Sequence, residues 1–474
     1  MSRTVRNSLI VVGVLIVAYP AIAWLLGLWV QHAWEEREQR GLQQVPGYAQ
    51  YVTIVKQDYR RGVYGATEEI TLRLGEKLLK ALRASGNADL PDHVQFVIRD
   101  TIHHGPFPQL RDFAPATVDT EWILPPEIHD KLLAAFKGKP SLTIHTRVNW
   151  LGGSTTLMRS PAFNLSLEKN VSVDWRGLEA RVVAGREIGS STVNLTSPGL
   201  TIKTEKGATV GFQDIKIDST LKPAYEVLTV GDMKLTLGQL RIESVEDANK
   251  PFKLIAHNLA GESHSQLNGE FLDGAGGLTV EAAQVNTFDT NRINYAARLT
   301  HIHAPAAAAL IKALRADQSD TPDNATPQEA AAANAKRTLD ALKGPGVDIL
   351  VKEPVVDITH LGFALPEGAL DISLEASMPG VTKGELQGEA DAIKTAVVKH
   401  LQLSANIRID TAMLDKLLES SGKGETTAAQ LQGLQRQGYL KLDGKALTTH
   451  ITFLGGQLRV NDQPFPPRPP GAPQ

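Results

Sequence analysis

The first pattern along the chain is an apolar run near its start. Residues Leu9 to Val30 carry no charged side chain and contain a single proline. A helix rises ~1.5 Å per residue, so this run spans ~33 Å and exceeds the ~30 Å thickness of a hydrocarbon core. The run therefore predicts a transmembrane helix.

The residues on either side of the run predict its orientation. Arg3 and Arg6 precede it, whereas a mixed and slightly acidic segment, 35–40, follows. Basic residues favour the cytoplasmic side, and Trp24 and Trp29 lie near the far end, where indole rings favour the headgroup layer. We therefore expect a cytoplasmic N-terminus and an exported body.

A cleaved signal peptide is the alternative interpretation of the same run. Ala21-Ile22-Ala23 supplies the small residues of a cleavage site. The apolar run continues for seven residues beyond Ala23, which a cleaved peptide does not require. This continuation favours an uncleaved anchor, and both interpretations export the rest of the chain.

Beyond the run, apolar and polar residues alternate with the period of a β-strand. In 214–221 the isoleucines and the leucine alternate with charged or hydroxyl residues, and 233–237, 370–375 and 401–409 repeat the scheme. A period of two places the apolar set on one side of a sheet and the polar set on the other. Glycine or proline recurs at intervals close to the ~8–12 residues of a β-meander, and sandwiches and barrels share this spacing.

Alanine-rich helical patterns interrupt the strands at 304–316 and 327–342. The predicted fold class is mainly β with helical inserts (α+β), with one N-terminal transmembrane helix followed by an elongated, mostly antiparallel β body. The expected segments are a cytoplasmic tip and signal anchor (1–30), a helical stalk (31–45), the N-terminal part of the β body (46–303), the helical insert (304–346), the C-terminal part of the β body (347–463) and a disordered proline-rich tail (464–474).

Composition narrows the range of functions. A net charge of −3 without a basic patch argues against nucleic-acid binding. The chain has no cysteine, which excludes disulfides, thiol nucleophiles and cysteine metal sites. We therefore expect the exported body to be stabilised by burial and by sheet hydrogen bonds.

Three short motifs stand in order behind the apolar run. They are Tyr59, Arg61 and Gly62 in the first strand pair, His104-Gly105-Pro106 in a turn, and Gly456 and Asn461 in the closing hairpin, where Asp462 replaces an expected glycine. In this order they resemble the YdgA/YihF-like proteins of Gram-negative bacteria. The likeness covers essentially the whole chain and has no established activity attached to it.

The resemblance implies an inner-membrane protein with a single span, a cytoplasmic N-terminus and a large periplasmic β-rich body. A more distant similarity to AsmA-type envelope proteins implies bent sheets that form an apolar trough suited to lipid chains, which is an analogy of fold alone.

The sequence contains two pairs of closely spaced histidines, a residue type that binds metal ions. His103 and His104 are adjacent on an expected strand and point to opposite faces, so they do not share one ion. His301 and His303 have the spacing that puts both rings on one face, but no third ligand is indicated by spacing. We interpret both pairs as structural or surface histidines, with 103–106 forming a turn.

No catalytic motif was found. Ser166 to Lys169 and Ser420 to Lys423 match the serine–lysine spacing of penicillin-binding enzymes, but the companion Lys-Thr-Gly is absent from the sequence. The sequence also lacks Gly-x-Ser-x-Gly, His-Glu-x-x-His and a Walker loop. We therefore expect no catalytic residue, no cofactor and no metal, and a protein that is not an enzyme.

Three functions follow from this reading. The first is binding or handling of lipid, or of another envelope component, in an open groove lined by leucine, isoleucine and valine. The second is a structural or assembly role, with a closed core and an exposed edge or patch that meets envelope proteins. The third, an enzyme, requires a polar pocket with clustered histidines and carboxylates. The oligomeric state, including a homo-oligomer, is left open.

Overall fold

The structure is a computed structural model of the chain. It describes residues 19–20, 22–28, 52–75, 79, 94–125, 133–134, 136–167, 171–187, 189–204, 207–244, 252–286, 288–316, 335–336, 338–388, 390–421 and 424–465. Leu9, Trp29, Val30, the predicted stalk and nearly all of the predicted tail lie outside these residues. In the part of the chain that is described, no helix has both the length and the apolar character needed to span a bilayer.

Within the described residues, the body forms one continuous antiparallel sheet of 23 strands. The strands are β1 (Val52–Arg61), β2 (Gly65–Leu74), β3 (Gln95–His104), β4 (Ala116–Ile123), β5 (Thr143–Val148), β6 (Ser154–Ser160), β7 (Phe163–Leu167), β8 (Val171–Trp175), β9 (Leu178–Ala184), β10 (Ser191–Lys203), β11 (Thr209–Tyr225), β12 (Leu228–Ser244), β13 (Phe252–Asn268), β14 (Phe271–Val285), β15 (Phe288–Thr290), β16 (Arg292–His303), β17 (Val355–Leu365), β18 (Gly368–Ser377), β19 (Gln402–Asp410), β20 (Lys441–Asp443), β21 (Ala446–Leu454), β22 (Gln457–Val460) and β23 (Gln463–Pro464).

Eight helical elements have bounds in the described part of the chain, and none is longer than 13 residues. They are the 3-10 turn η1 (Pro108–Leu110), α5 (Ala304–Ala316), the π-helical segment η3 (Leu342–Gly346), α7 (Val347–Leu350), α8 (Lys383–Leu386), α9 (Ala390–His400), α10 (Thr411–Ser421) and α11 (Gly424–Arg436). Residues 22–28 are also helical. The structure therefore agrees with the expectation of a mostly antiparallel β protein with helical inserts.

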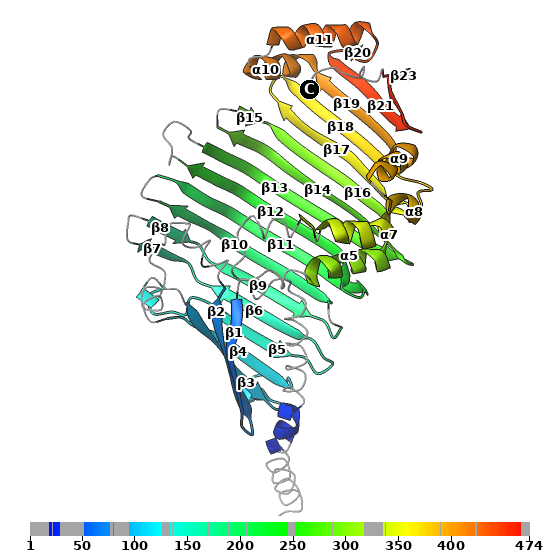
Figure 1. Cartoon of the computed structure of the whole chain (residues 1–474). Helices are drawn as coiled ribbons and strands as arrows, with labels where there is room; N and C mark the ends of the chain where they lie inside the picture. Colours follow the sequence, from blue (N-terminus) through cyan, green and yellow to red (C-terminus); the bar gives the residue numbers. More distant parts are fainter. Residues whose placement is uncertain are drawn as a thin grey trace, which may run out of the picture.

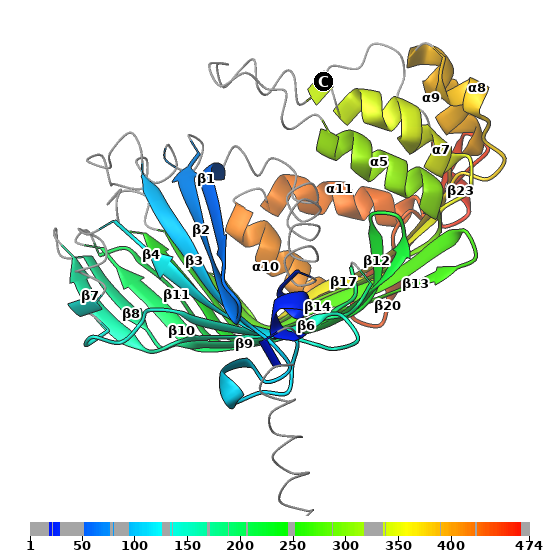
Figure 2. The same cartoon turned by 90° about the horizontal axis from the view of Figure 1, so that it is seen from below.

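The strands follow one another as a meander. Most pair with their neighbours in sequence, as in the run from β9 to β14. The run is continued by β14–β16 and β16–β17, so the strands on either side of the helical insert belong to the same sheet. Figure 1 shows the strands stacked along the length of the molecule, and Figure 2 shows the sheet curved into a trough with the helices on its concave side.

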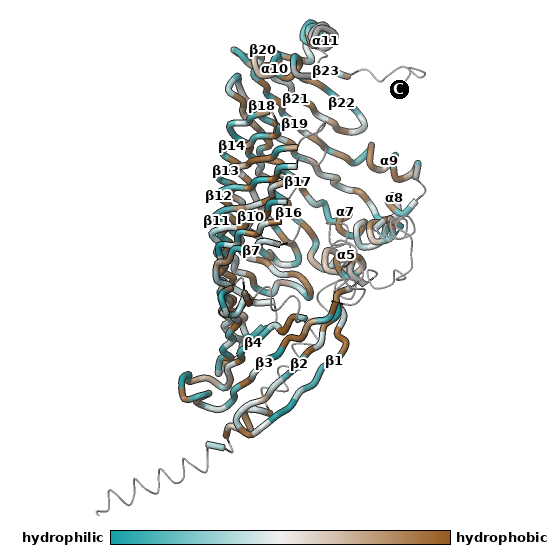
Figure 3. The backbone as a smooth tube through the Cα atoms, turned by 90° about the vertical axis from the view of Figure 1, so that its left-hand side faces the viewer, coloured by the Kyte–Doolittle hydropathy of each residue, from teal (hydrophilic) through white to brown (hydrophobic). Residues whose placement is uncertain are grey.

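The two faces of the sheet differ in polarity. The register aligns Ile217 with Leu235 and then Gly261, Leu278 and Tyr295 on successive strands, and residues directly opposite each other share a face. Lys216, Lys234 and Glu262 belong to the alternate set, which forms the other face. The alternation of apolar and polar residues along the strands is visible in Figure 3.

The apolar face is the concave one. Leu267, on the same side of β13 as Leu259, packs with Leu228 against Ala304 and Ala308 of α5. Because α5 lies within the curve of the sheet in Figure 2, the apolar set lines the inside of the trough.

A line of backbone bends crosses the sheet and interrupts strict alternation. Asp214 of β11 and Asn258 of β13 have left-handed φ values of 53° and 49°. Ala256 and Leu259, on either side of Asn258, consequently pack in one cluster although unbroken alternation would separate them. The prediction that Asp214 belongs to a regular alternating strand is therefore wrong. Asparagine and aspartate tolerate this conformation, and it keeps the concave face apolar where the strands bend.

Candidate functional site: an open apolar trough

The floor of the trough carries large apolar side chains that remain in contact with solvent. Met233 is 46% exposed, Leu278 39%, Tyr295 41%, Leu299 45% and Leu361 40%. In a closed sandwich such inward-facing positions would be covered by a second sheet. The exposed fractions therefore favour an open groove over a closed core along this part of the sheet.

The buried core of the body is divided into small clusters. One joins β2, β3 and β4 through Ala66, Ile102 and Val118, with Tyr59 of β1 packed against it. Two others lie beneath α5 and beneath α7–α9, and the fourth lies at the bend in the sheet. Two of these clusters therefore lie where helices pack on the sheet, whereas the other two lie among the first strands and at the bend.

Helices form the rims of the trough rather than its lid. α5 and α7 lie along one margin in Figure 1, whereas α10 and α11 lie at the far end, where α10 packs on β18 and β19. Met413 of α10 is completely buried. α5 contacts β11 and β16, and α7 contacts β16, so these two helices border one margin of the floor.

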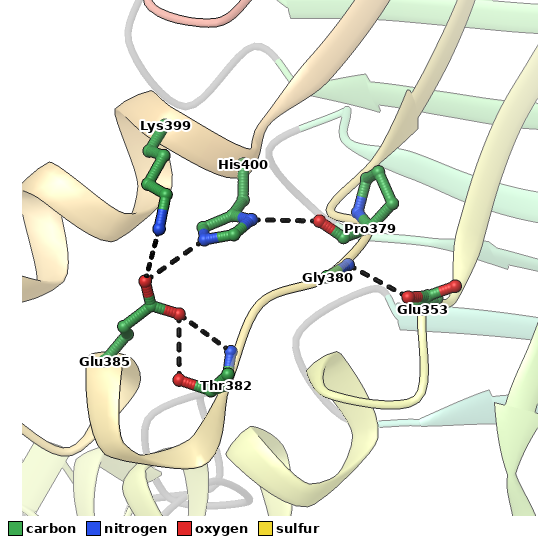
Figure 4. A network of polar contacts seen from close by, with 7 residues as sticks. All are labelled: Glu353, Pro379, Gly380, Thr382, Glu385, Lys399 and His400. Carbon is green, nitrogen blue, oxygen red and sulfur yellow. Dashed lines mark hydrogen bonds and ion pairs between the residues drawn. The ribbon is translucent and has the colours of Figure 1, made fainter.

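A polar network fixes the rim at α8 and α9 (Figure 4). Glu385 accepts hydrogen bonds from the Thr382 backbone N–H (3.0 Å) and hydroxyl (2.8 Å), and its other oxygen contacts Lys399 Nζ (2.9 Å) and His400 Nε2 (3.2 Å). Hydrogen bonds from Lys399 and Thr382 hold the pKa of Glu385 well below its ordinary value. His400 Nδ1 donates to the carbonyl of Pro379 (2.9 Å), so the network ties both helices to the end of β18.

The convex face holds a depression lined by two histidines. It has a volume of about 540 Å³, and its lining residues include His360, Asp371, Asn406 and His450. His360 Nδ1 lies 3.3 Å from Asp371, whereas His450 Nδ1 lies 2.8 Å from the Asn406 amide oxygen. The two imidazoles thus have separate partners, and within the described residues no group of three or more potential metal ligands is found.

The other candidate residues have structural environments. Both His301 and His303 contact the ring of Phe271, with His301 stacked on it at 3.8 Å between centroids and His303 tilted at 5.9 Å. Ser166 lies in β7 and Ser420 in α10. The lysines spaced from these serines, Lys169 and Lys423, lie outside the described residues.

The first two sequence motifs meet at a socket for the N-terminal helix. His104 Nδ1 donates to the carbonyl of Ala23 (2.9 Å), and the Tyr19 hydroxyl donates to the carbonyl of Phe107 (2.9 Å). The Arg61 guanidinium lies 5.2 Å from the centre of the Trp24 ring, which is a cation–π distance. The socket therefore receives part of the apolar run recognised in the sequence.

The socket depends on small residues as well as on polar ones. Ala23 and His104 are 0% and 1% exposed. Gly105 has φ of 135° and lies so close to the helix that a Cβ would be 3.3 Å from Ala23 Cβ. Burial lowers the pKa of His104, and the neighbouring Arg61 lowers it further, so the imidazole is neutral at pH 7.

The sequence placed His103 and His104 in a turn, but the structure places both at the end of β3, and the turn begins at Gly105. Pro106 follows in that turn and is half-buried. The turn between β1 and β2 is closed by a hydrogen bond from Gly62 N–H to the Gly65 carbonyl (2.7 Å).

The third motif closes the opposite end of the sheet. Asn461 is 8% exposed, and its Nδ2 donates to the carbonyls of Gly438 and Tyr439, both at 3.0 Å. Its Oδ1 accepts from the His450 backbone N–H (3.0 Å). Gly456 supplies a φ of 78° to the preceding turn. Asp462 has φ of 66°, a conformation that glycine adopts without strain, consistent with the glycine expected there.

The sequence did not reveal the socket or the bend in the sheet. The signals that could have found them are Ala23 and Gly27, which are spaced like two small residues on one helix face, and the polar residues Asp214 and Asn258 within otherwise regular strands.

Comparison with known proteins shows the family of this chain. Residues 1–468 match the family described as bacterial protein of unknown function (DUF945). Neither curated proteins nor solved structures give a match. Since the match extends over nearly the whole chain, this protein belongs to the bacterial DUF945 family.

Proposed function

We propose that this protein is a non-enzymatic component of the bacterial cell envelope that holds lipid acyl chains on the concave face of its sheet. The observation that carries the proposal is the row of solvent-exposed apolar side chains on the trough floor, from Met233 to Leu361. Contiguous apolar surface of this kind marks a binding site for apolar partners.

The chemistry of the floor suits an acyl chain better than a polar ligand. Ile217, Leu235, Leu278 and Tyr295 lie in one row across the sheet, and Gly261 is the residue on the strand between Leu235 and Leu278. The row therefore runs along the stacking direction of the strands. The floor supplies few hydrogen-bond partners, since charged residues belong to the alternate set. An extended hydrocarbon chain needs burial and no specific polar contacts.

The cellular location belongs to the same proposal. We place the N-terminal apolar run at the inner membrane as an uncleaved anchor, with the N-terminus cytoplasmic and the body in the periplasm. The part of the run from Tyr19 onward is docked on the body. The buried contact of Ala23 with His104 supports an uncleaved run, because cleavage after Ala23 would remove residues 1–23 and take away the carbonyl that accepts the hydrogen bond of the buried His104 Nδ1. The resemblance to YdgA/YihF-like and AsmA-type envelope proteins supports the same location.

Native mass spectrometry with lipid extraction tests this function on the full chain purified from a bacterial membrane. Phospholipid is expected to copurify with the wild-type protein and to be lost from Leu278→Asp. The matched control is Thr279→Asp, because Thr279 is the next residue of β14 and lies on the convex face. Circular dichroism and the thermal midpoint establish that both variants are folded.

A folded, lipid-free wild-type protein would overturn the lipid proposal, as would equal lipid loss from both variants. An assembly scaffold is then the leading function. A photo-crosslinking residue at Leu361 separates the two, since the trough proposal expects crosslinks to lipid and the scaffold expects crosslinks to protein.

A further inference from the structure

Three connections between strands lie at the same end of the strands, around the N-terminal helix. They are the β1–β2 turn (62–64), the β3–β4 loop (105–115) and the β5–β6 turn (149–153). Because neighbouring strands are antiparallel, alternate connections fall at the same end of the strands. Figure 1 shows the helix, in dark blue, below β3 and β5 at the lower end of the molecule. We call these three connections the tips.

Aromatic rings join the tips to the helix in one row. Tyr64 stacks with Tyr19 of the helix at 6.0 Å between ring centroids. The Tyr19 hydroxyl donates a hydrogen bond to the backbone carbonyl of Phe107. The ring centroids of Phe107 and Phe113 lie 5.3 Å apart. Phe113 in turn lies 5.1 Å from Trp150. The tips and the helix therefore form one continuous surface.

This surface is unusually exposed for its composition. Leu110 is 85% exposed and Leu151 87%, and the residues Tyr64, Phe107 and Phe113 are between 47% and 59% exposed. Leucine at this exposure is unfavourable in water, and here two such residues flank a row of aromatic rings.

The place of the patch in the chain indicates what covers it. Tyr19 contacts the patch directly, and the residues before it, from Leu9 to Ala18, are entirely apolar apart from glycine in the sequence. The apolar run therefore meets the body within the patch. Tryptophan, tyrosine and phenylalanine favour the boundary between headgroups and acyl chains, which surrounds the end of a membrane span.

We propose that the tips insert into the headgroup–acyl boundary of the membrane that holds the apolar run, so the partner of this patch is a phospholipid bilayer surface. The proposal rests on the anchor proposed above and concerns a surface separate from the trough. The tips contain one basic and one acidic residue, Arg111 and Asp112, so apolar and aromatic groups carry the contact rather than attraction to anionic headgroups.

Single-cysteine labelling tests the proposal, since the chain has no native cysteine. Leu110→Cys and Leu151→Cys are labelled with an environment-sensitive fluorophore, and the full chain is reconstituted into phosphatidylcholine vesicles. The matched control is Leu442→Cys in β20, a 56% exposed leucine at the opposite end of the sheet. All three positions are exposed, so labelling leaves the packed clusters intact.

The expected result is a blue-shifted emission at positions 110 and 151, and loss of that emission when nitroxide phospholipids are included. The label at position 442 is expected to keep its emission in water. Adding phosphatidylglycerol is expected to change neither result.

Each alternative outcome overturns the proposal. Labels at 110 and 151 that remain in water show that the tips stand clear of the bilayer. A blue shift without quenching shows that protein, such as a second copy of the chain, covers the patch. A chain that fails to float with the vesicles removes the anchor as well, whereas lipid in the trough is measured separately by mass spectrometry.

Discussion

The socket makes a sharp prediction for Gly27. A Cβ at this position would lie 2.6 Å, 2.8 Å and 2.9 Å from three ring atoms of His104. The ring has little freedom to move, because it is 1% exposed and bonded to the carbonyl of Ala23. Gly27→Ala is therefore expected to loosen the helix from the body.

The size of the effect follows from three contributions. Forcing a methyl group into a packed site costs about 1–3 kcal/mol. Losing the bond between His104 and Ala23 costs about 1 kcal/mol. Alanine regains about 1 kcal/mol of helix propensity over glycine. The net expectation is a loss of about 2 kcal/mol in the free energy of docking, which corresponds to a roughly 30-fold larger opening equilibrium constant and hence faster amide exchange.

Hydrogen–deuterium exchange of the full chain in detergent micelles measures this opening. Amides in 22–28 and at the end of β3 are expected to exchange faster in Gly27→Ala. The matched control is Gly433→Ala in α11, where a Cβ meets nothing within 4 Å. The control is expected to leave exchange in α11 unchanged or to slow it.

Unchanged exchange in Gly27→Ala would refute the reasoning, since it would mean that the contact with His104 does not hold the helix. Faster exchange throughout the sheet would also contradict it, because the predicted loss is confined to the socket.

Two further predictions concern the sequence motifs. The pKa of His104 is lowered from its ordinary value of 6.5, so the undocked state takes up the proton first. Docking is therefore expected to be strongest above pH 6.5 and to weaken as the pH falls through the lowered pKa; exchange of 22–28 with the same pH dependence in His104→Asn would argue against this. Asn461→Ala removes three side-chain hydrogen bonds and leaves alanine with a left-handed φ, so the free energy of unfolding is expected to fall by about 2–4 kcal/mol. The urea midpoint measures that loss, and a wild-type midpoint would contradict it.

The sequence predicted the fold class because the chain repeats one simple pattern. Alternation of Ile215 and Ile217 with polar neighbours specifies a two-faced strand, and turns at short intervals specify a meander. The same pattern could not distinguish an open trough from a closed sandwich. That choice depends on whether a second layer exists, and period-two alternation is identical in both cases.

The socket illustrates a second limit. The motif His104-Gly105-Pro106 predicts a turn, but the residue to which His104 is hydrogen-bonded, Ala23, lies 81 positions away in the sequence. Local propensity carries no information about such a pairing. Asp214 is an example of a local pattern that misleads. It fits the alternation of polar and apolar residues, but its left-handed φ bends the strand at that position.

In a meander, the extent of the sheet along its stacking direction depends on the number of hairpins. Each strand advances the sheet by roughly 4.8 Å, so adding or deleting one hairpin would change its length by about 10 Å. The interior strands contact mainly their neighbours, as in arrays of repeats, so such a change leaves distant parts undisturbed. The socket at His104 and the hydrogen bonds of Asn461 lie towards opposite ends of this array of strands. The length of the trough and the docking of the N-terminal helix are therefore independent of each other in this architecture. A longer or shorter protein of this kind could keep both ends of the sheet and differ only in the number of strands between them.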